Sequence, residues 1–207
     1  MKTNIASFAH HLHQVAQFCG RDELLPVYTY LRLHVTKTEL TLSSTNRYEA
    51  GHVVIPRDDQ GDDQWTTYLS VTNRRQLSSL LARNQWHTEL RGDYAKGNVQ
   101  LVPRGDWLDI TATVGSDTSM LTMRTTPDLD YPSGAINKLV NVENPVIAGF
   151  NPGFLRQVMP GERNTPTIVS AEPGHSGPVT FQSQGAAGEK ITTVIMAMRL
   201  PDGMAAK

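Results

Sequence analysis

The sequence predicts an α+β fold made of repeated units, each with one helix and a following set of antiparallel strands, with the helices on one face of the sheet. Three observations support this prediction. Apolar residues recur at helical spacing in three short segments, alternating strand-like stretches follow each segment, and the whole arrangement repeats along the 207 residues. A unit of this size cannot close its own sheet edge, so its copies are expected to pair side by side.

The first unit begins with an amphipathic helix, for which Gly20 stands at the expected C-cap. The apolar residues that recur at three- and four-residue spacing are Ile5, Phe8, Ala9, Leu12, Val15, Ala16 and Cys19. Strands are predicted at residues 28–35, 39–44 and 51–55, with the first hairpin turning at residues 36–38. The acidic residues 58–63 lack the spacing of a calcium-binding loop and are expected to form a solvated loop.

The second and third units repeat the pattern. A strand at 66–71 leads to a helix that Thr72 or Asn73 caps and that continues through Leu81. Strands are then predicted near residues 86–91, 99–103, 107–114 and 120–125. Residues 128–134 link to the third unit. That unit has a strand at 146–150, a helix at 152–158 that starts with Pro152, and strands near 167–170, 178–182 and 192–198.

Composition indicates an ordinary globular protein of one or two domains. Hydrophobic residues make up 39% and charged residues 19% of the chain, and the net charge of −1 means that any nucleic-acid signal must be local. The single Cys19 excludes an intrachain disulfide and fits a reducing cytosol. Neither a signal peptide nor a run of roughly 20 apolar residues is visible, so we expect a cytoplasmic protein without a membrane segment.

Three stretches resemble one known family. Residues 25–28 (LPVY) and 45–50 (TNRYEA) are similar to its R-P-V-L … A-T-D-R-Y-R-L-A run. Residues 68–71 (YLSV), the helix at 74–83 and the closing sequence Asp130-Tyr131-Pro132 resemble the second half of the same domain. Residues 150–155 (FNPGFL) and 196–200 (MAMRL) resemble the end of the last domain. Together they resemble the bacterial-type DNA sliding clamp, the beta subunit of DNA polymerase III, which is a ring that tethers a polymerase to DNA.

The resemblance implies the DNA-clamp (processivity) fold and a domain division. Residues 1–134 resemble the middle domain of the clamp, and residues 135–207 resemble the C-terminal half of its last domain. Known clamps of this type have three domains, or six units, per chain, whereas this chain has three units. Asn46 replaces the usual acid, Glu49 replaces the second base, and Ala197 replaces the proline of the terminal strand. The reduced size suggests a phage-encoded version.

The resemblance also implies a groove that binds partner peptides. Residue-by-residue matching assigns its middle-domain wall to Tyr28, Thr45, Arg47, Tyr48 and Ala50. The other wall is assigned to Asn151, Phe154, Pro178, Val179, Met196, Met198, Arg199 and Leu200. Flexible methionines suit a pocket that must accept several partners. Strand alternation places Met196 and Met198 on one face, which is equally compatible with packing in the core.

The three predicted helices lack acidic residues. Residues 1–20, 69–88 and 144–161 contain no Asp or Glu, while the acids gather in strands and loops. In the clamp family the helices line the central hole, so the resemblance implies that Arg74, Arg75, Arg83 and Arg156 contact DNA phosphates. The alternative is that three short helices lack acids by chance.

No constellation of residues indicates an enzyme, a metal site or a cofactor. His10, His11 and His13 have no flanking carboxylate or cysteine and are expected on a solvated or DNA-facing helix surface. Cys19 has no His or Asn close in sequence and is expected to be a buried small hydrophobe. The glycine-bounded turn at 92–97 lacks the context of a phosphate loop.

Two functions are compatible with these features. The first is a minimal sliding clamp, a homo-oligomeric ring on duplex DNA that binds a polymerase and a clamp loader through short peptide motifs. The second is a clamp-derived binding module that keeps the groove, forms no ring, and sequesters or modulates replication proteins.

Overall fold

The computed structural model describes residues 1–22, 24–59, 61–85, 96–140, 168–171, 178–185 and 188–196. Its first unit contains β1 (Lys2–Asn4), α1 (Ile5–Ala16), the 3-10 helix η1 (Pro26–Thr29), β2 (Leu31–Val35), β3 (Glu39–Thr45) and β4 (Glu49–Pro56). The second unit contains β5 (Trp65–Leu69), α2 (Val71–Gln85), β6 (Asn98–Arg104), β7 (Trp107–Val114) and β8 (Asp117–Arg124). The chain continues with α4 (Ser133–Val140), β9 (Ile168–Ala171), β10 (Val179–Gln184) and β11 (Lys190–Ile195).

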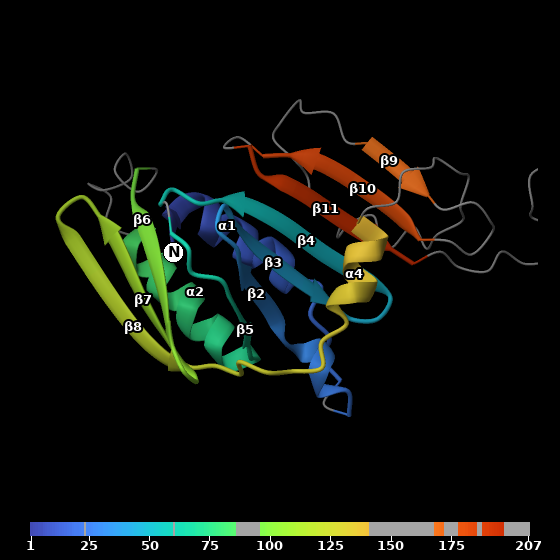
Figure 1. Cartoon of the computed structure of the whole chain (residues 1–207), viewed down its shortest axis with the longest axis horizontal. Helices are drawn as coiled ribbons and strands as arrows, with labels where there is room; N and C mark the ends of the chain where they lie inside the picture. Colours follow the sequence, from blue (N-terminus) through green and yellow to red (C-terminus); the bar gives the residue numbers. More distant parts are fainter. Residues whose placement is uncertain are drawn as a thin grey trace, which may run out of the picture.

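The strands form two antiparallel sheets (Figure 1). The four-stranded sheet has the order β1-β6-β7-β8, and the seven-stranded sheet has the order β5-β2-β3-β4-β11-β10-β9. The first two units exchange their first strands, because β5 pairs with β2 and β1 pairs with β6. Each unit therefore completes the sheet of the other, and β11 joins the third unit to the first by pairing with β4.

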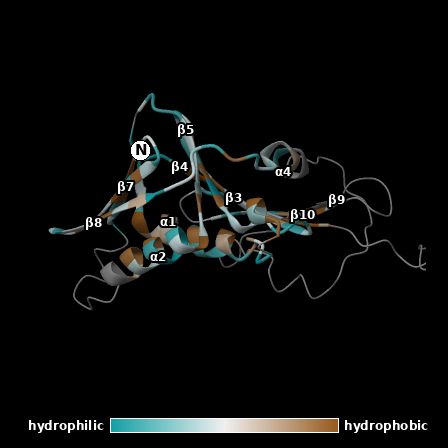
Figure 2. Cartoon of the chain, turned by 90° about the horizontal axis from the view of Figure 1, so that it is seen from below, coloured by the Kyte–Doolittle hydropathy of each residue, from teal (hydrophilic) through white to brown (hydrophobic). Residues whose placement is uncertain are grey.

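The core lies between these sheets and the helices α1 and α2. Strand register places Leu33, Leu42, Val53 and Ile191 in one row across β2, β3, β4 and β11, and all four are buried in the same cluster as Phe8 of α1. We call this side of the seven-stranded sheet the helix face. Figure 2 shows α1 and α2 side by side on this side of the molecule, and α4 on the opposite side, which we call the outer face.

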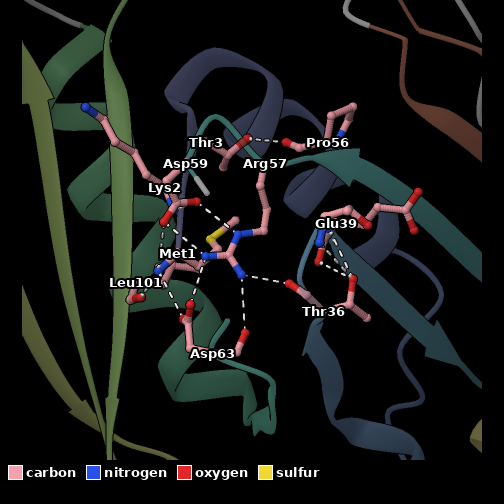
Figure 3. Close-up of polar contacts among 11 residues, drawn as sticks. Met1, Lys2, Thr3, Thr36, Glu39, Pro56, Arg57, Asp59, Asp63 and Leu101 are labelled. Carbon is pink, nitrogen blue, oxygen red and sulfur yellow. Dashed lines mark hydrogen bonds and ion pairs between the residues drawn. The ribbon is translucent and has the colours of Figure 1, made fainter. Parts of the chain in front are cut away.

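A partly buried ion-pair cluster joins the first unit to the edge of the four-stranded sheet (Figure 3). The guanidinium of Arg57 donates to both carboxylate oxygens of Asp59 at 2.9 and 3.0 Å and to Oδ1 of Asp63 at 2.9 Å. It also donates to the carbonyl of Thr36 at 2.7 Å. The amino group of Met1 lies 3.4 Å from Oδ2 of Asp63. The acidic loop is expected to be solvated, and Asp58, Asp62 and Asp63 are exposed as expected. Asp59 is only partly exposed, because Arg57 holds its carboxylate.

A second polar contact connects α1 to the third unit. The Nε2 atom of His11 lies 3.4 Å from Oε1 of Glu189, and Nδ1 lies 3.0 Å from Oε1 of Gln14. Ser7 also donates a hydrogen bond to Glu189. His11 is 3% exposed, so the prediction of a solvated His11 is wrong, although His10 and His13 are exposed.

Most elements agree with the sequence prediction, and the α+β fold class is confirmed. Three differences concern short segments. The predicted strand at 28–35 begins only at Leu31, because Pro26 starts a 3-10 turn. Strand β1 was not predicted, since three residues are too few to show alternation. Helix α4 occupies what was interpreted as the link and its continuation. The strands predicted at 86–91 and 146–150 and the helix at 152–158 lie outside the described residues.

Candidate partner-binding site and basic helix face

A small apolar cluster covers the outer face beneath α4. Its buried members are Ala50, Tyr68, Tyr131, Ile136 and Val194, and Val27, Tyr30 and Leu129 pack against it. We call these eight residues the outer cluster. They come from η1 and its end, the strands β4, β5 and β11, and the segment 129–136. The outer cluster therefore gathers parts of all three units on one surface.

Tyr131 anchors the segment that carries α4. Its hydroxyl donates to the carbonyl of Ser43 at 3.2 Å, and its ring centroid lies 5.4 Å from that of Tyr68. Burial raises the pKa of Tyr131, so the phenol stays protonated and can serve as the donor. The neighbouring helix then places Ile136 against β4 and β11.

The turn between β3 and β4 projects two side chains beside this cluster. The Oδ1 atom of Asn46 accepts from the amides of Tyr48 and Glu49 at 3.0 and 2.9 Å, and Nδ2 donates to Oε2 of Glu49 at 3.0 Å. Arg47 takes the left-handed conformation with φ of 82°, and Tyr48 is 60% exposed. The guanidinium carbon of Arg47 lies 5.9 Å from the Tyr48 ring centroid.

Asn46 and Glu49 both differ from the sequence pattern that this turn resembles, and each of the two residues is the hydrogen-bond partner of the other. Glu49 is 3% exposed, and burial raises its pKa while the Asn46 hydrogen bond acts in the opposite direction. An amide at position 46 can donate to that carboxylate, whereas an acid there would repel it. The hydrogen bond from Asn46 to Glu49 thus stabilises this turn without the acid and the base that the pattern usually has at these positions.

The third unit extends the same surface. Thr45, Ala50, Val194 and Thr180 form one row across four adjacent strands, and the row lies on the outer face. The amide of Met196 donates to the carbonyl of Tyr48 at 2.8 Å, which carries the strand pairing past the end of β11. Val179 pairs with Ile195, which pairs with Glu49, so its side chain belongs to the helix-face row instead.

The predicted wall residues are therefore placed as follows. Tyr28 follows Val27 in η1, and Ala50 belongs to the outer cluster itself. Thr45, Arg47, Tyr48 and Met196 lie beside Ala50 along the β3–β4 turn and the end of β11. Pro178 is buried at the start of β10. Asn151, Phe154, Met198, Arg199 and Leu200 lie outside the described residues. Sequence reasoning missed Tyr131 and Ile136 as site residues, although the pair Tyr131-Pro132 was noticed and could have identified them.

The helix face carries a hollow of about 970 Å³ where α1 ends and α2 begins. Arg21, Arg74 and Arg75 line it, together with small polar residues of α2 such as Thr72 and Ser78. Ser70 caps α2, because its hydroxyl accepts from the amide of Asn73 at 3.2 Å. The positive end of the α2 dipole therefore lies at this hollow.

The predicted DNA-contacting arginines differ in their surroundings. Arg74 donates to the carbonyls of Ala16 at 3.3 Å and Thr29 at 3.0 Å, so its guanidinium ties α1 and η1 to α2. Arg75 is exposed on the next position. The side chain of Arg83 and the whole of Arg156 lie outside what the structure describes. Arg75 is thus better placed than Arg74 to meet a phosphate.

Other candidate chemistries find no support in the described residues. Cys19 is buried, its thiol donates to the carbonyl of Tyr30 at 3.6 Å, and burial raises its pKa. Within the described ranges no three His, Cys, Asp or Glu side chains are grouped to hold a metal. None of the helices in those ranges has the length and apolar character that a membrane span requires.

No protein-family model and no curated protein sequence matches this chain. Solved structures do. The beta subunit of DNA polymerase III from Thermotoga maritima is 12% identical with a TM-score of 0.63, and the match covers 97% of this chain and 65% of that one. The sliding clamp from Bacillus subtilis is 16% identical with a TM-score of 0.54, covering 96% of this chain and 49% of that one. The DNA polymerase III subunit beta from Pseudomonas aeruginosa is 13% identical with a TM-score of 0.56, and the match covers 98% of this chain and 66% of that one.

The chain has the DNA-clamp fold. More specifically, it has the fold of the beta sliding clamps of DNA polymerase III, and it spans about half to two thirds of the length of the solved clamps that it matches.

Proposed function

We propose that this protein is a minimal sliding clamp, a processivity factor that assembles from several copies around duplex DNA, tethers a replicative polymerase, and binds partner peptides on the outer cluster. The observation that carries the proposal is the joining of three clamp units through the β4–β11 pairing, with the outer cluster across the join. The domain division at residue 134 is part of the proposal. The proposed role is non-catalytic and needs no cofactor, and it places the protein in the cytoplasm.

The outer cluster has the composition that a peptide site requires. The central members of the cluster are buried, so the partly buried Val27, Tyr30 and Leu129 at its margin would receive Leu and Phe of an extended partner segment. Arg47, Asn46 and Tyr48 provide a polar rim. One of the solved clamps with this fold is a Pseudomonas aeruginosa protein bound to griselimycin. A polymerase and a clamp loader are the partners that we expect to supply such segments.

The helix face has the composition that sliding requires. The described exposed positions include His10 and His13 of α1, Gln17 at its C-cap and Arg75 of α2, and neither helix contains an acidic residue. Diffuse contacts of this kind bind phosphates without reading bases. A closed ring should thread onto linear duplex, stay bound when the ends are then blocked, and be released when the duplex is cut. Release before cutting would contradict the clamp. If peptide binding persisted in that case, the binding module without a ring would be supported.

We expect Met196→Asp to weaken the binding of a peptide with a Gln followed by spaced Leu and Phe at least about tenfold. The reason is that buried Leu and Phe side chains contribute roughly 1.5–3 kcal/mol each, and a carboxylate beside them must be desolvated. Fluorescence anisotropy of a labelled peptide measures the effect, and circular dichroism checks the fold. The matched control is Met120→Asp, the same change on the other sheet, which should leave the affinity unchanged. Equal peptide affinities for the wild type, Met196→Asp and Met120→Asp would show that the peptide does not bind beside the outer cluster.

We expect Arg75→Ala to weaken DNA binding and Arg74→Ala to reduce the stability of the fold. Arg75→Ala should weaken nonspecific DNA binding and lower the slope of log K against log salt by about one, at an unchanged melting temperature. Arg74→Ala should lower the free energy of unfolding by about 1–3 kcal/mol, because the carbonyls of Ala16 and Thr29 lose their donor. Salt titrations on linear duplex with open ends and thermal melts separate the two effects. An unchanged salt slope for Arg75→Ala would show that α2 does not contact phosphates.

A further inference from the structure

Strand β2 carries an arginine beside the outer cluster. Arg32 pairs with Tyr68 of β5 and lies two residues after Tyr30, so strand alternation places all three on the outer face. On its other side Arg32 pairs with Ser43 of β3, which in turn pairs with His52 of β4. Arg32 and His52 therefore lie in one row across the outer face, with only the small side chain of Ser43 between them.

The guanidinium of Arg32 has no acidic partner in the part of the chain that the structure describes. Arg57, Arg104 and Arg124 each form an ion pair with an aspartate. Arg32 is half-buried but forms no ion pair within the described ranges, and its Nε is buried without a hydrogen-bond partner. A buried donor without an acceptor costs free energy, so such a group indicates that something else binds there.

His52 supplies a second buried donor in the same row. It is 8% exposed, and its Nδ1 also lacks a hydrogen-bond partner. Burial, and then the charge of Arg32, lowers the pKa of His52 to about 4, so the two groups are close enough to interact and the ring is neutral at pH 7. The tautomer with the proton on Nδ1 can donate a hydrogen bond without carrying a charge. One anionic group above Ser43 can therefore accept from both side chains.

We propose that Arg32 and His52 form a carboxylate-binding subsite beside the outer cluster, which receives an Asp or Glu side chain of the partner segment. Charge complementarity favours this occupant, because the row offers a cation and a neutral donor, and its other members Tyr68 and Ser43 carry no charge. The subsite rests on the proposed function, since the apolar side chains of the same segment must occupy the outer cluster. It adds a charge requirement to the choice of partner.

The spacing along β2 restricts the position of the acid in the partner segment. Tyr30 belongs to the margin of the outer cluster, and Arg32 follows it on the same face at a distance of about 7 Å along the strand. An extended segment has the same period of two residues. Its acidic side chain should therefore lie two positions from the apolar side chain that contacts Tyr30, and the direction of the segment decides at which end.

Four peptides test the subsite. Each contains the spaced Leu and Phe and carries either Glu or Gln, two residues before the Leu or two residues after the Phe. At one of the two ends, the wild type should bind the Glu peptide about tenfold more tightly than the Gln peptide in fluorescence anisotropy. Arg32→Met should abolish this preference, and His52→Val should reduce it. The matched control is Arg104→Met, which removes a 73% exposed guanidinium from the four-stranded sheet and should leave the preference unchanged.

Thermal melts provide a second measurement. Arg32→Met keeps the stem of the side chain and removes a charge that has no acidic partner among the described residues, so the melting temperature should not fall. A fall as large as that caused by Arg57→Met, which breaks a paired guanidinium, would show that Arg32 supports the fold and would overturn the subsite.

The binding results separate this proposal from the proposed function. Equal affinities for Glu and Gln at both ends overturn the subsite while leaving peptide binding on the outer cluster intact. A preference for Glu that persists in Arg32→Met also overturns the subsite, because the carboxylate then binds elsewhere. If none of the four peptides binds the wild type, peptide binding on the outer cluster and the subsite are both wrong.

Discussion

Arg57→Met should lower the free energy of unfolding by about 2–3 kcal/mol. The side chain of Arg57 is 1% exposed, and its guanidinium is the shared partner of Asp59, Asp63 and the carbonyl of Thr36. Methionine keeps much of the buried stem but leaves the carbonyl of Thr36 and the two partly exposed carboxylates without their donor, which is costly. The expected loss of unfolding free energy is smaller than for a fully buried ion pair, because the side chains of Asp59 and Asp63 are 31% and 43% exposed.

Urea unfolding at pH 7 measures the effect, and the chain provides a matched control. Lys37 lies 2.8 Å from Asp62, but these side chains are 61% and 91% exposed. Lys37→Ala should therefore change the free energy of unfolding by less than about 0.5 kcal/mol. Losses of equal size for Arg57→Met and Lys37→Ala would show that the partly buried cluster contributes no more than an exposed ion pair.

The same cluster predicts acid sensitivity. Hydrogen bonding to Arg57 holds the pKa values of Asp59 and Asp63 below the usual value of 3.8. A carboxyl with a depressed pKa contributes stability that is present above the pKa of the unfolded chain and is lost as the pH falls through the folded value. This contribution should therefore disappear only below about pH 4, and Arg57→Met should remove it.

His52→Val should make the protein about 3 kcal/mol less sensitive to acidification from pH 7.5 to pH 4. Burial, together with the nearby charge of Arg32, lowers the pKa of His52 from 6.5 to about 4. His52 is 8% exposed, and its Nδ1 has no hydrogen-bond partner, so the folded state favours the neutral ring. As the pH falls below 6.5, the unfolded chain binds a proton that the folded chain rejects, and stability is lost down to the folded pKa.

Urea titrations at several pH values measure this difference, with His13→Gln on the exposed surface of α1 as the control. The window between pH 6.5 and 4 lies above the one expected for the Arg57 cluster, so the two contributions can be separated. His34 adds in the same direction, because burial and then Arg32 lower its pKa as well. If the free energy of unfolding changed with pH in the same way for the wild type and His52→Val, the assignment of a neutral buried His52 would be wrong.

Local patterns predicted much of the fold because they depend on which side of an element is buried. The alternation at Leu31, Leu33 and Val35 defines the buried face of β2, and the helical spacing of Ile5, Phe8 and Leu12 defines that of α1. The resemblance then selected the clamp fold and most of the residues that surround the outer cluster. The link segment was interpreted incorrectly because its helix α4 is short and its apolar residues pack only in the assembled fold.

The sequence by itself determined most of the helices and strands and their buried faces, since these follow from periodicities of 3.6 and 2 residues. Only the tertiary structure decided which elements meet. The pairing of β4 with β11, the position of Tyr131 over Tyr68, and the partners of Arg57 and Arg74 all join residues that are far apart in the chain. Periodicity reports that a side chain is buried or exposed but carries no information about its partner. For that reason the sequence grouped Arg74 with Arg75, although the carbonyls of Ala16 and Thr29 hold the half-buried Arg74 and Arg75 is exposed.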